Sequence, residues 1–343
     1  MKVPPVPTGL ERAGGWAWRL LVVAAAASLF LALLWYLKVI VLPAIIALTI
    51  APALTPLAGW LRRHGLGRAA PATALVAGVA VVAALVAVVT ASLAADYDEL
   101  ATQVRQGVDD LTGWLEGEPF NLSLERDRPL DESLSGAWER ASSYLLSGVR
   151  SGASVIAGLI LALTLLYFVL RDGAAFWRRV LRRFGPDTQA QLDRAGRRAW
   201  SVLGGYVRGT ALIAAIDASL IGIGLWVLGV PLPFALAVLI FLGSFIPFVG
   251  ATIAGLVAVL VALADGGITT AAIVLALVLG VQFLEGTFLQ PVIQSRTVDL
   301  HPAVILLAVA AGASLFGILG AYLAVPVTAV AFAVAASLAA EPE

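Results

Sequence analysis

The sequence of 343 residues contains no cysteine and only two histidines, His64 and His301. Without cysteine there are no disulfides, no thiol chemistry and no cysteine metal ligands. Two histidines are too few for a histidine-rich metal site. The sequence therefore predicts neither a metal site nor a cofactor.

Charge is also scarce, because only 13% of the residues are charged and the formal net charge is zero. This balance gives no reason to expect a nucleic-acid partner. Hydrophobic residues make up 60% of the chain, and the mean hydropathy of +0.95 lies far outside the range of soluble proteins. Single prolines and glycines interrupt the apolar runs, which membrane helices tolerate. We therefore expect an all-α polytopic membrane protein in contact with the lipid bilayer.

Residues 1–95 are predicted to form three membrane spans. Three apolar runs, at 20–37, 39–57 and 69–95, are long enough to cross about 30 Å of hydrocarbon. No small-residue cleavage site follows the first run, so we interpret it as a retained span and not as a signal peptide.

Residues 96–150 are acidic and carry apolar side chains at steps of three and four residues. This pattern predicts amphipathic helices in a small extracytoplasmic insert. The insert is either a solvated connector that packs on the membrane surface or a module that binds a partner.

Residues 151–208 combine a fourth span, at 151–170, with a strongly basic segment. Aromatic side chains alternate with the arginines, which is typical of helices that lie along lipid headgroups. RNA also binds such patches, but beside membrane spans the anionic leaflet is the better partner. The arginines are Arg171, Arg178, Arg179, Arg182, Arg183, Arg194, Arg197, Arg198 and Arg208.

The loops predict the orientation of the chain. Basic loops stay in the cytoplasm, and the basic stretches at 57–68 and 171–208 flank the acidic insert with an odd number of spans on either side. We therefore expect a cytoplasmic N-terminus and a multi-pass protein of the bacterial inner (plasma) membrane.

Residues 209–343 are predicted to form a transport core. The span at 209–228 contains Asp217, and another at 268–283 is followed by Glu285. Two longer apolar segments, 234–264 and 302–338, are interrupted at 246–250 and 317–320, which predicts broken or re-entrant hairpins. In total we expect about seven to eight membrane-embedded helical segments.

The core also contains an internal repeat of one acid-bearing span and one broken segment. A proline precedes a glycine by ten residues in both units: Pro233 and Gly243, then Pro302 and Gly312. Downstream, Gly250-Ala-Thr-Ile-Ala254 matches Gly320-Ala-Tyr-Leu-Ala324. Paired interrupted segments of this kind indicate a transporter's binding site, because the break frees backbone groups for a ligand.

The last part of the chain carries a series of motifs: Phe245-Ile-Pro247-x-x-Gly250, Gln282-x-x-Glu285, Gln290-Pro291, Leu300-His301-Pro302, Gly312, and Gly317-Ile-Leu-Gly320-Ala…Ala324-Val-Pro326. This series resembles the signature of the autoinducer-2 exporter family, the PerM-type bacterial permeases. The resemblance implies an inner-membrane transporter that assembles as a homo-oligomer, with a pentamer among the assemblies it suggests. The resemblance leaves the substrate open, because the substrates of the family range from signalling molecules in some members to cations exchanged for protons in others.

The polar residues of the core are the candidates for a substrate or ion pathway: Asp217, Gln282, Glu285 and Gln290. A carboxylate within a span is costly and usually faces protein or water. The alternative is structural: Asp217 as a cap or ion-pair partner, and the glutamines as hydrogen-bond donors between helices. The hairpin and gate candidates are Pro247, Gly250, Pro291, Pro302, Gly317 and Gly320, and His301 is interpreted as a hairpin-entry residue.

Three functions are compatible with these features. The first is a transporter of a small polar solute or ion, coupled to an ion gradient through the carboxylates, and a sodium/proton exchanger is one form of it. The second is a passive oligomeric channel or pore. The third, an intramembrane enzyme, is disfavoured because the sequence has no H-E-x-x-H, G-x-S-x-G or phosphate-binding motif. We therefore do not expect an enzyme.

Overall fold

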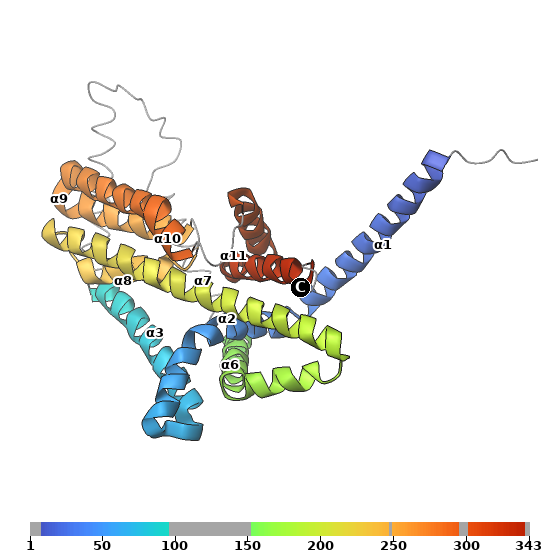
Figure 1. Ribbon diagram of the computed structural model, residues 1–343. Coiled ribbons are helices and arrows are strands. Elements are labelled where there is room, and N and C mark those ends of the chain that lie inside the picture. The colour runs from blue at the N-terminus through green and yellow to red at the C-terminus, as the bar shows by residue number, and fades with distance from the viewer. Residues whose placement is uncertain (1–7, 96–151, 247–248, 295–300, 340–343) are drawn as a thin grey trace, which may run out of the picture.

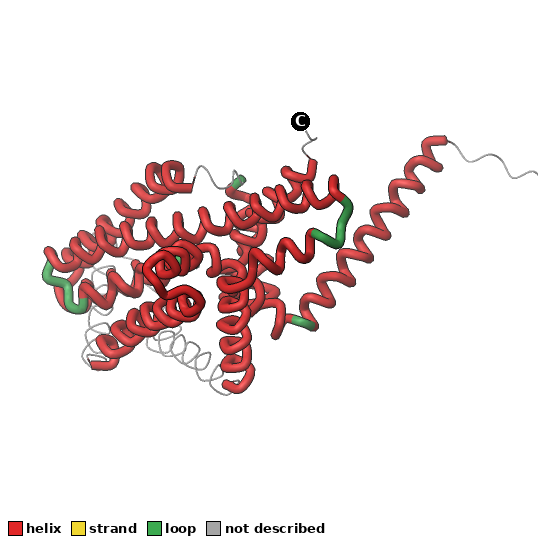
Figure 2. Tube along the Cα trace, turned by 60° about the horizontal axis from the view of Figure 1, so that its bottom comes forward, coloured by secondary structure: helices red, strands yellow, loops and turns green. Residues whose placement is uncertain are grey.

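The computed structural model describes residues 8–95, 152–246, 249–294 and 301–339, and every element within these ranges is helical (Figures 1 and 2). The prediction of an all-α protein is confirmed for this part of the chain. The predicted insert at 96–150 and Pro247 lie outside the described residues. The division into four regions stays a prediction.

The N-terminal region contains three long helices joined by short turns. These are α1 (Thr8–Tyr36), α2 (Lys38–Leu61) and α3 (Ala70–Ala95), and a π-helical turn (Arg62–Leu66) and a 3-10 turn (Gly67–Ala69) form the basic loop between α2 and α3. Figures 1 and 2 both show α1 projecting away from the other helices. The three predicted runs therefore coincide with three helices.

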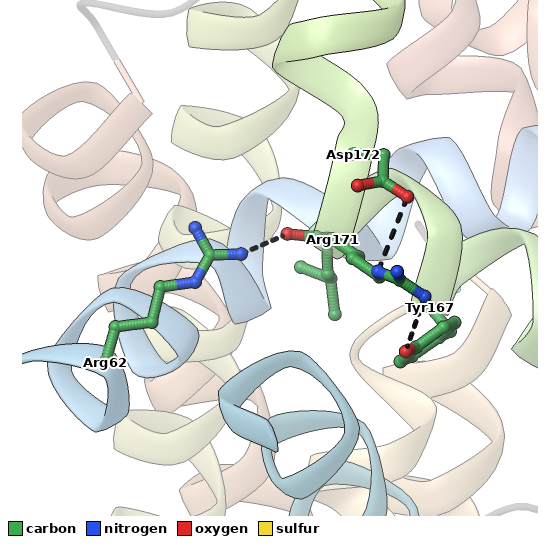
Figure 3. A network of polar contacts seen from close by, with 5 residues as sticks. Arg62, Tyr167, Arg171 and Asp172 are labelled. Atoms are coloured by element: carbon green, nitrogen blue, oxygen red, sulfur yellow. Dashed lines mark hydrogen bonds and ion pairs between the residues drawn. The ribbon is translucent and has the colours of Figure 1, made fainter. Parts of the chain in front are cut away.

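Helix α6 (Gly152–Leu181) packs against α2 through alanine and leucine side chains. Ala47 and Ala51 of α2 and Leu166 and Leu170 of α6 are buried in this contact. Nearby, Arg62 Nη2 donates a hydrogen bond of 2.9 Å to the backbone oxygen of Leu170 (Figure 3). The basic loop is thereby tied to the point at which α6 leaves its apolar stretch.

Helix α7 (Pro186–Val227) is the longest element and ends in a glycine cap. Gly229 has φ 72°, and the N–H groups of Gly229 and Val230 donate to the carbonyls of Trp226 and Leu225. This is the Schellman pattern, in which a left-handed glycine satisfies the last carbonyls of a helix. Val230 and Leu225 are buried in the same cluster, so the cap also turns the chain back onto the core.

The C-terminal half consists of α8 (Pro233–Gly243), α9 (Val249–Leu284), a π-helical turn (Glu285–Leu289), α10 (Gln290–Gln294) and α11 (Pro302–Ala339). The chain leaves the helical path between α8 and α9, at Gly267 within α9, and at Phe316–Gly317 within α11. Both predicted interruptions therefore exist. In α11 the break begins at Phe316, whereas Gly320 is already helical, and Figure 1 shows α11 as two rods meeting at an angle.

The two broken segments share one contact between glycine backbones. A Cβ atom on Gly243 would lie 2.7 Å from the carbonyl oxygen of Gly250, and one on Gly312 would meet the carbonyl oxygen of Gly320. The reciprocal positions, Gly250 and Gly320, are equally closed by the glycines opposite them. The internal repeat found in the sequence therefore has the same physical basis in both units, which is a backbone approach that only glycine permits.

Five helical stretches within the described residues are long and apolar enough to cross a membrane: 38–91, 156–181, 186–227, 250–293 and 303–339. The first contains α2 and α3, and the fourth contains both arms of α9. The expected seven to eight embedded segments stay a prediction, as does their re-entrant path. The largest buried cluster joins α7, α8 and α9, and a second joins α7 and α11, so α7 lies between both broken segments.

Candidate functional site

A cavity of about 340 Å³ lies where α7, the α8–α9 break, the turn after α9 and α11 meet. It contains three of the four predicted pathway residues, Gln282, Glu285 and Gln290. Segments from both broken units contribute to its wall. The remaining lining residues are Tyr206, Thr210, Ile213, Ser244, Ile246, Ala251, Thr252, Gly286, Ile305 and Val325.

Glu285 reaches this cavity from a π-helical turn. Such a turn inserts one extra residue into the helical path and is frequent at functional sites. Gln290, at the start of α10, donates a hydrogen bond of 3.0 Å from Nε2 to Glu285 Oε1. One carboxylate oxygen is therefore held in place by a neighbour from the same predicted motif.

Asp217 lies on α7, and the residue is only 3% exposed. It is not part of the cavity wall, but its carboxyl group interacts with that of Glu285. Its Oδ1 atom is buried and has no hydrogen-bond partner among the described residues. A buried carboxylate oxygen without a partner is costly, so a proton or a cation that reached this atom would remove that cost.

Two further residues of α7, Tyr206 and Thr210, line the cavity and are not among the pathway residues predicted from the sequence. The Thr210 Oγ1 atom is near Tyr206 but is buried without hydrogen-bond geometry to any described partner. These residues precede Asp217 by eleven and seven positions, so all three share one helix face. That spacing of polar residues within an apolar span was a signal that pointed to them.

Four of the predicted gate residues lie at the helix breaks or at the start of α11. Gly250 and Gly320 lie in the close backbone contacts, and Gly317 adopts φ 64° at the break in α11. Pro302 begins α11, where its missing N–H is harmless. His301 Nδ1 accepts a hydrogen bond of 3.2 Å from the N–H of Ala303, which is the helix-entry role expected for it.

Of the other two predicted gate residues, one lies away from the cavity and one is outside the described residues. Pro291 is exposed on α10 and does not line the cavity. Pro247 belongs to the two residues between α8 and α9 that the structure does not describe. No group of three or more histidine, aspartate or glutamate side chains in the described ranges is arranged to hold a metal ion.

A larger cavity of about 570 Å³ lies between α3, α7 and α8, and it has a different character. Its lining is apolar except for Ser219 and the indole of Trp226, and it contains no titratable residue. The chemistry of the core is therefore concentrated in the smaller cavity beside Glu285 and Asp217.

Comparison with known proteins indicates a transporter, as the motif series in the sequence does. The model of a family described as "AI-2E family transporter" matches residues 24–340. The chain is 38% identical to "Putative transport protein MT0215" of Mycobacterium tuberculosis over 93% of its own length and 89% of the relative's. It is 29% identical to YrrI of Bacillus subtilis, covering 86% and 85%, and 27% identical to YhhT of Escherichia coli K12, covering 85% and 82%. Both of these relatives also carry the name "Putative transport protein".

Proposed function

The chain belongs to the AI-2E family of transporters, and we propose that it moves a small polar solute or a cation across the bacterial inner membrane through the cavity beside Glu285. Transport is coupled to an ion gradient through Glu285 and Asp217. The chain has no phosphate-binding motif for a nucleotide, so the energy comes from an ion gradient or from the solute's own gradient.

One observation carries this proposal: two carboxyl groups from different units of the repeat interact beside a cavity that is lined by amide, hydroxyl and phenol groups. Asp217 comes from the first acid-bearing helix and Glu285 from the second. Adjacent carboxylates repel each other in a medium of low dielectric constant, and a bound proton or cation removes that repulsion. The pair therefore has the chemistry that ion coupling needs.

The two broken segments supply the gates. Backbone groups freed by a helix break must find partners in protein, water or a ligand, and the α8–α9 break places Ser244 and Ile246 in the cavity wall. α11 contributes Ile305 and Val325, which lie on either side of its own break. Movement of either segment would change access to the cavity.

Purified protein in liposomes tests the proposal directly. The vesicles contain a pH-sensitive dye, and sodium, potassium or labelled polar solutes are imposed as gradients. We expect flux that saturates with substrate and responds to an imposed pH or sodium gradient. Flux that is linear in concentration and ignores both gradients would support a passive pore and would end the coupled-transport proposal.

The orientation and assembly belong to the same proposal. A cytoplasmic N-terminus follows from the basic loops, and a homo-oligomer follows from the family resemblance. Apolar side chains of the projecting helix α1, such as Leu21, Val23 and Leu29, are more than 60% exposed, so they face lipid or another subunit. The subunit number can be measured by native mass spectrometry of the purified protein.

A further inference from the structure

The second part of α6 and the first part of α7 form a helical hairpin at 171–208, here called the arginine hairpin. It contains nine arginines and three aspartates, and no lysine or glutamate. Figure 1 shows α6 changing direction so that its last part runs beside the start of α7. The turn between them spans residues 182–185.

The two helices of the arginine hairpin pack against each other. Trp177 Nε1 donates a hydrogen bond of 3.2 Å to Asp193 Oδ1, which joins the two helices. A Cβ atom on Gly196 would collide with the Trp177 ring, so the two helices are in direct contact there. Leu181 of α6 and Ala195 of α7 are also buried. The arginines are therefore displayed from a defined surface.

Most of the positive charge on this surface is not neutralised by the protein. Asp193 is used by Trp177 and by an ion pair with Arg197, and Asp172 pairs with Arg171 at 3.6 Å. Within the described residues the other seven arginines have neither an ion pair nor a hydrogen bond, and their side chains are exposed. These seven are Arg178, Arg179, Arg182, Arg183, Arg194, Arg198 and Arg208.

Exposed aromatic side chains accompany the unpaired arginines. Phe176 is 63% exposed, Phe184 is 46% exposed and Trp200 is 37% exposed. Water is a poor solvent for these rings, whereas the boundary between headgroups and acyl chains accommodates rings and arginines together. The surface thus combines two features that a lipid interface satisfies at once.

The lengths of the helices show that the hairpin extends out of the hydrocarbon region. The 42 residues of α7 correspond to roughly 60 Å of helix, about twice the hydrocarbon thickness. The apolar end of α7 carries Asp217 and the core packing, so the excess length lies at the arginine end. Both helices run without interruption from an apolar stretch into the hairpin.

We propose that the arginine hairpin is a binding surface for the headgroups of anionic phospholipids in the membrane that surrounds this protein. The exposed guanidinium groups bind phosphate oxygens of lipids such as phosphatidylglycerol, and the exposed rings enter the acyl boundary. Arginine suits this role because its planar guanidinium donates paired hydrogen bonds to phosphate. The proposal does not depend on the transport mechanism.

The test uses a single cysteine introduced as Thr188→Cys, an exposed position in the first turn of α7, in a chain that otherwise has none. The cysteine carries a fluorophore, and the full-length protein is reconstituted in phosphatidylcholine vesicles with a minority of brominated lipid. The brominated lipid is either phosphatidylglycerol or phosphatidylcholine. We expect brominated phosphatidylglycerol to quench the fluorophore at a much lower mole fraction than brominated phosphatidylcholine does. This preference for the anionic lipid should decrease at high salt.

Neutral variants identify the residues responsible. One basic side chain near an anionic surface contributes about fivefold to the association. Replacing Arg178, Arg182 and Arg183 by glutamine should therefore reduce the preference for phosphatidylglycerol by more than about tenfold. The control is Arg63→Gln with Arg68→Gln, which removes two exposed arginines from the other basic loop and should leave the preference unchanged.

Four results would overturn the proposal. These are equal quenching by the two lipids, no quenching by either, a preference that survives in the triple variant, and a loss that is as large in the control. If the triple variant fails to fold, Arg194→Gln with Arg198→Gln tests the same surface from the other helix.

Discussion

The carbonyl oxygen of Gly243 lies where a side chain on Gly250 would have to begin. The two residues flank the break between α8 and α9, and their backbones touch across it. Gly312 and Gly320 stand in the same relation across the break in α11. Each broken segment is thus closed by one glycine pair.

An alanine is the next neighbour of each glycine pair. A Cβ atom on Gly243 would lie 3.4 Å from the Ala254 methyl group, and one on Gly312 would lie 3.0 Å from that of Ala324. The two contacts therefore match in the residues around them as well as in the glycines themselves.

Gly250→Ala and Gly320→Ala should each force apart the two helical arms that meet at a glycine pair. Overpacking a closed contact costs about 1–3 kcal/mol, because the obstacle is backbone and cannot rotate away. We expect lower melting temperatures in detergent and a loss of transport. Gly280→Ala is the control, since nothing lies within 4 Å of its Cβ position. If both hairpin variants kept wild-type stability, the glycine pairs would have no role in closing the segments.

Asp217→Asn and Glu285→Gln should insert and fold normally but transport at least about tenfold more slowly, corresponding to about 1.4 kcal/mol in the rate-limiting step. Each variant keeps the shape of its side chain and removes one of the two interacting carboxyl groups. The response of flux to an imposed pH gradient should weaken as well. Wild-type flux and pH dependence in both variants would assign the carboxyl groups a structural role.

Gln290→Leu removes the donor that holds Glu285 Oε1. We expect a several-fold loss of transport, and little further loss when Gln290→Leu is added to Glu285→Gln, because Gln290 acts through its hydrogen bond to Glu285. Pro291→Ala on the same short helix does not alter the cavity wall and is the matched control. Fully additive losses in the double variant would mean that Gln290 acts independently of Glu285.

Val249→Cys and Leu319→Cys test from which side of the membrane the two broken segments are reached, in a chain without native cysteine. If the repeat is inverted, membrane-impermeant thiol reagents should reach the two positions from opposite sides of oriented vesicles. Arg63→Cys in the basic loop, which its charge predicts to be cytoplasmic, provides the reference position. Labelling of both hairpin positions from one side would contradict an inverted arrangement.

Arg62→Gln should lower stability by about 1 kcal/mol, because a charged donor to the backbone oxygen of Leu170 is lost. This loss is smaller than is usual for a hydrogen bond from a charged donor, because the Arg62 side chain is exposed to solvent. A decrease of a few degrees in the melting temperature is expected. Arg63→Gln, which makes no such bond, should have little effect, and equal decreases in the two variants would show that the bond contributes nothing measurable.

The sequence predicted the elements well because the interruptions are local signals. Prolines and glycines predicted the breaks near residues 246 and 317. Three residues of the motif series, Gln282, Glu285 and Gln290, line one cavity, and their role in transport stays a prediction. Helix ends also followed local chemistry, as at His301 and Pro302.

The packing of the helices was much harder to predict. In a membrane protein the lipid-facing and protein-facing sides of a helix are both apolar, so hydrophobic periodicity does not show which side is buried. No local sequence pattern predicted that Asp217 would lie close to Glu285, which is sixty-eight residues further along the chain. Tyr206 and Thr210 were not predicted to line the cavity, because the sequence does not show which face of α7 is buried. Their helical spacing from Asp217 was the one available signal.

Helix α7 carries the arginine hairpin at one end and Asp217 nearer the other, with no interruption between them. Because α7 is continuous, a change in its tilt that alters the cavity would also move the arginines at its other end relative to the lipid headgroups. Thermodynamic linkage then works in both directions. The composition of the lipids around the arginine hairpin would then set the occupancy of the proposed transport states, and binding of the transported solute would in turn change how tightly the protein retains those lipids.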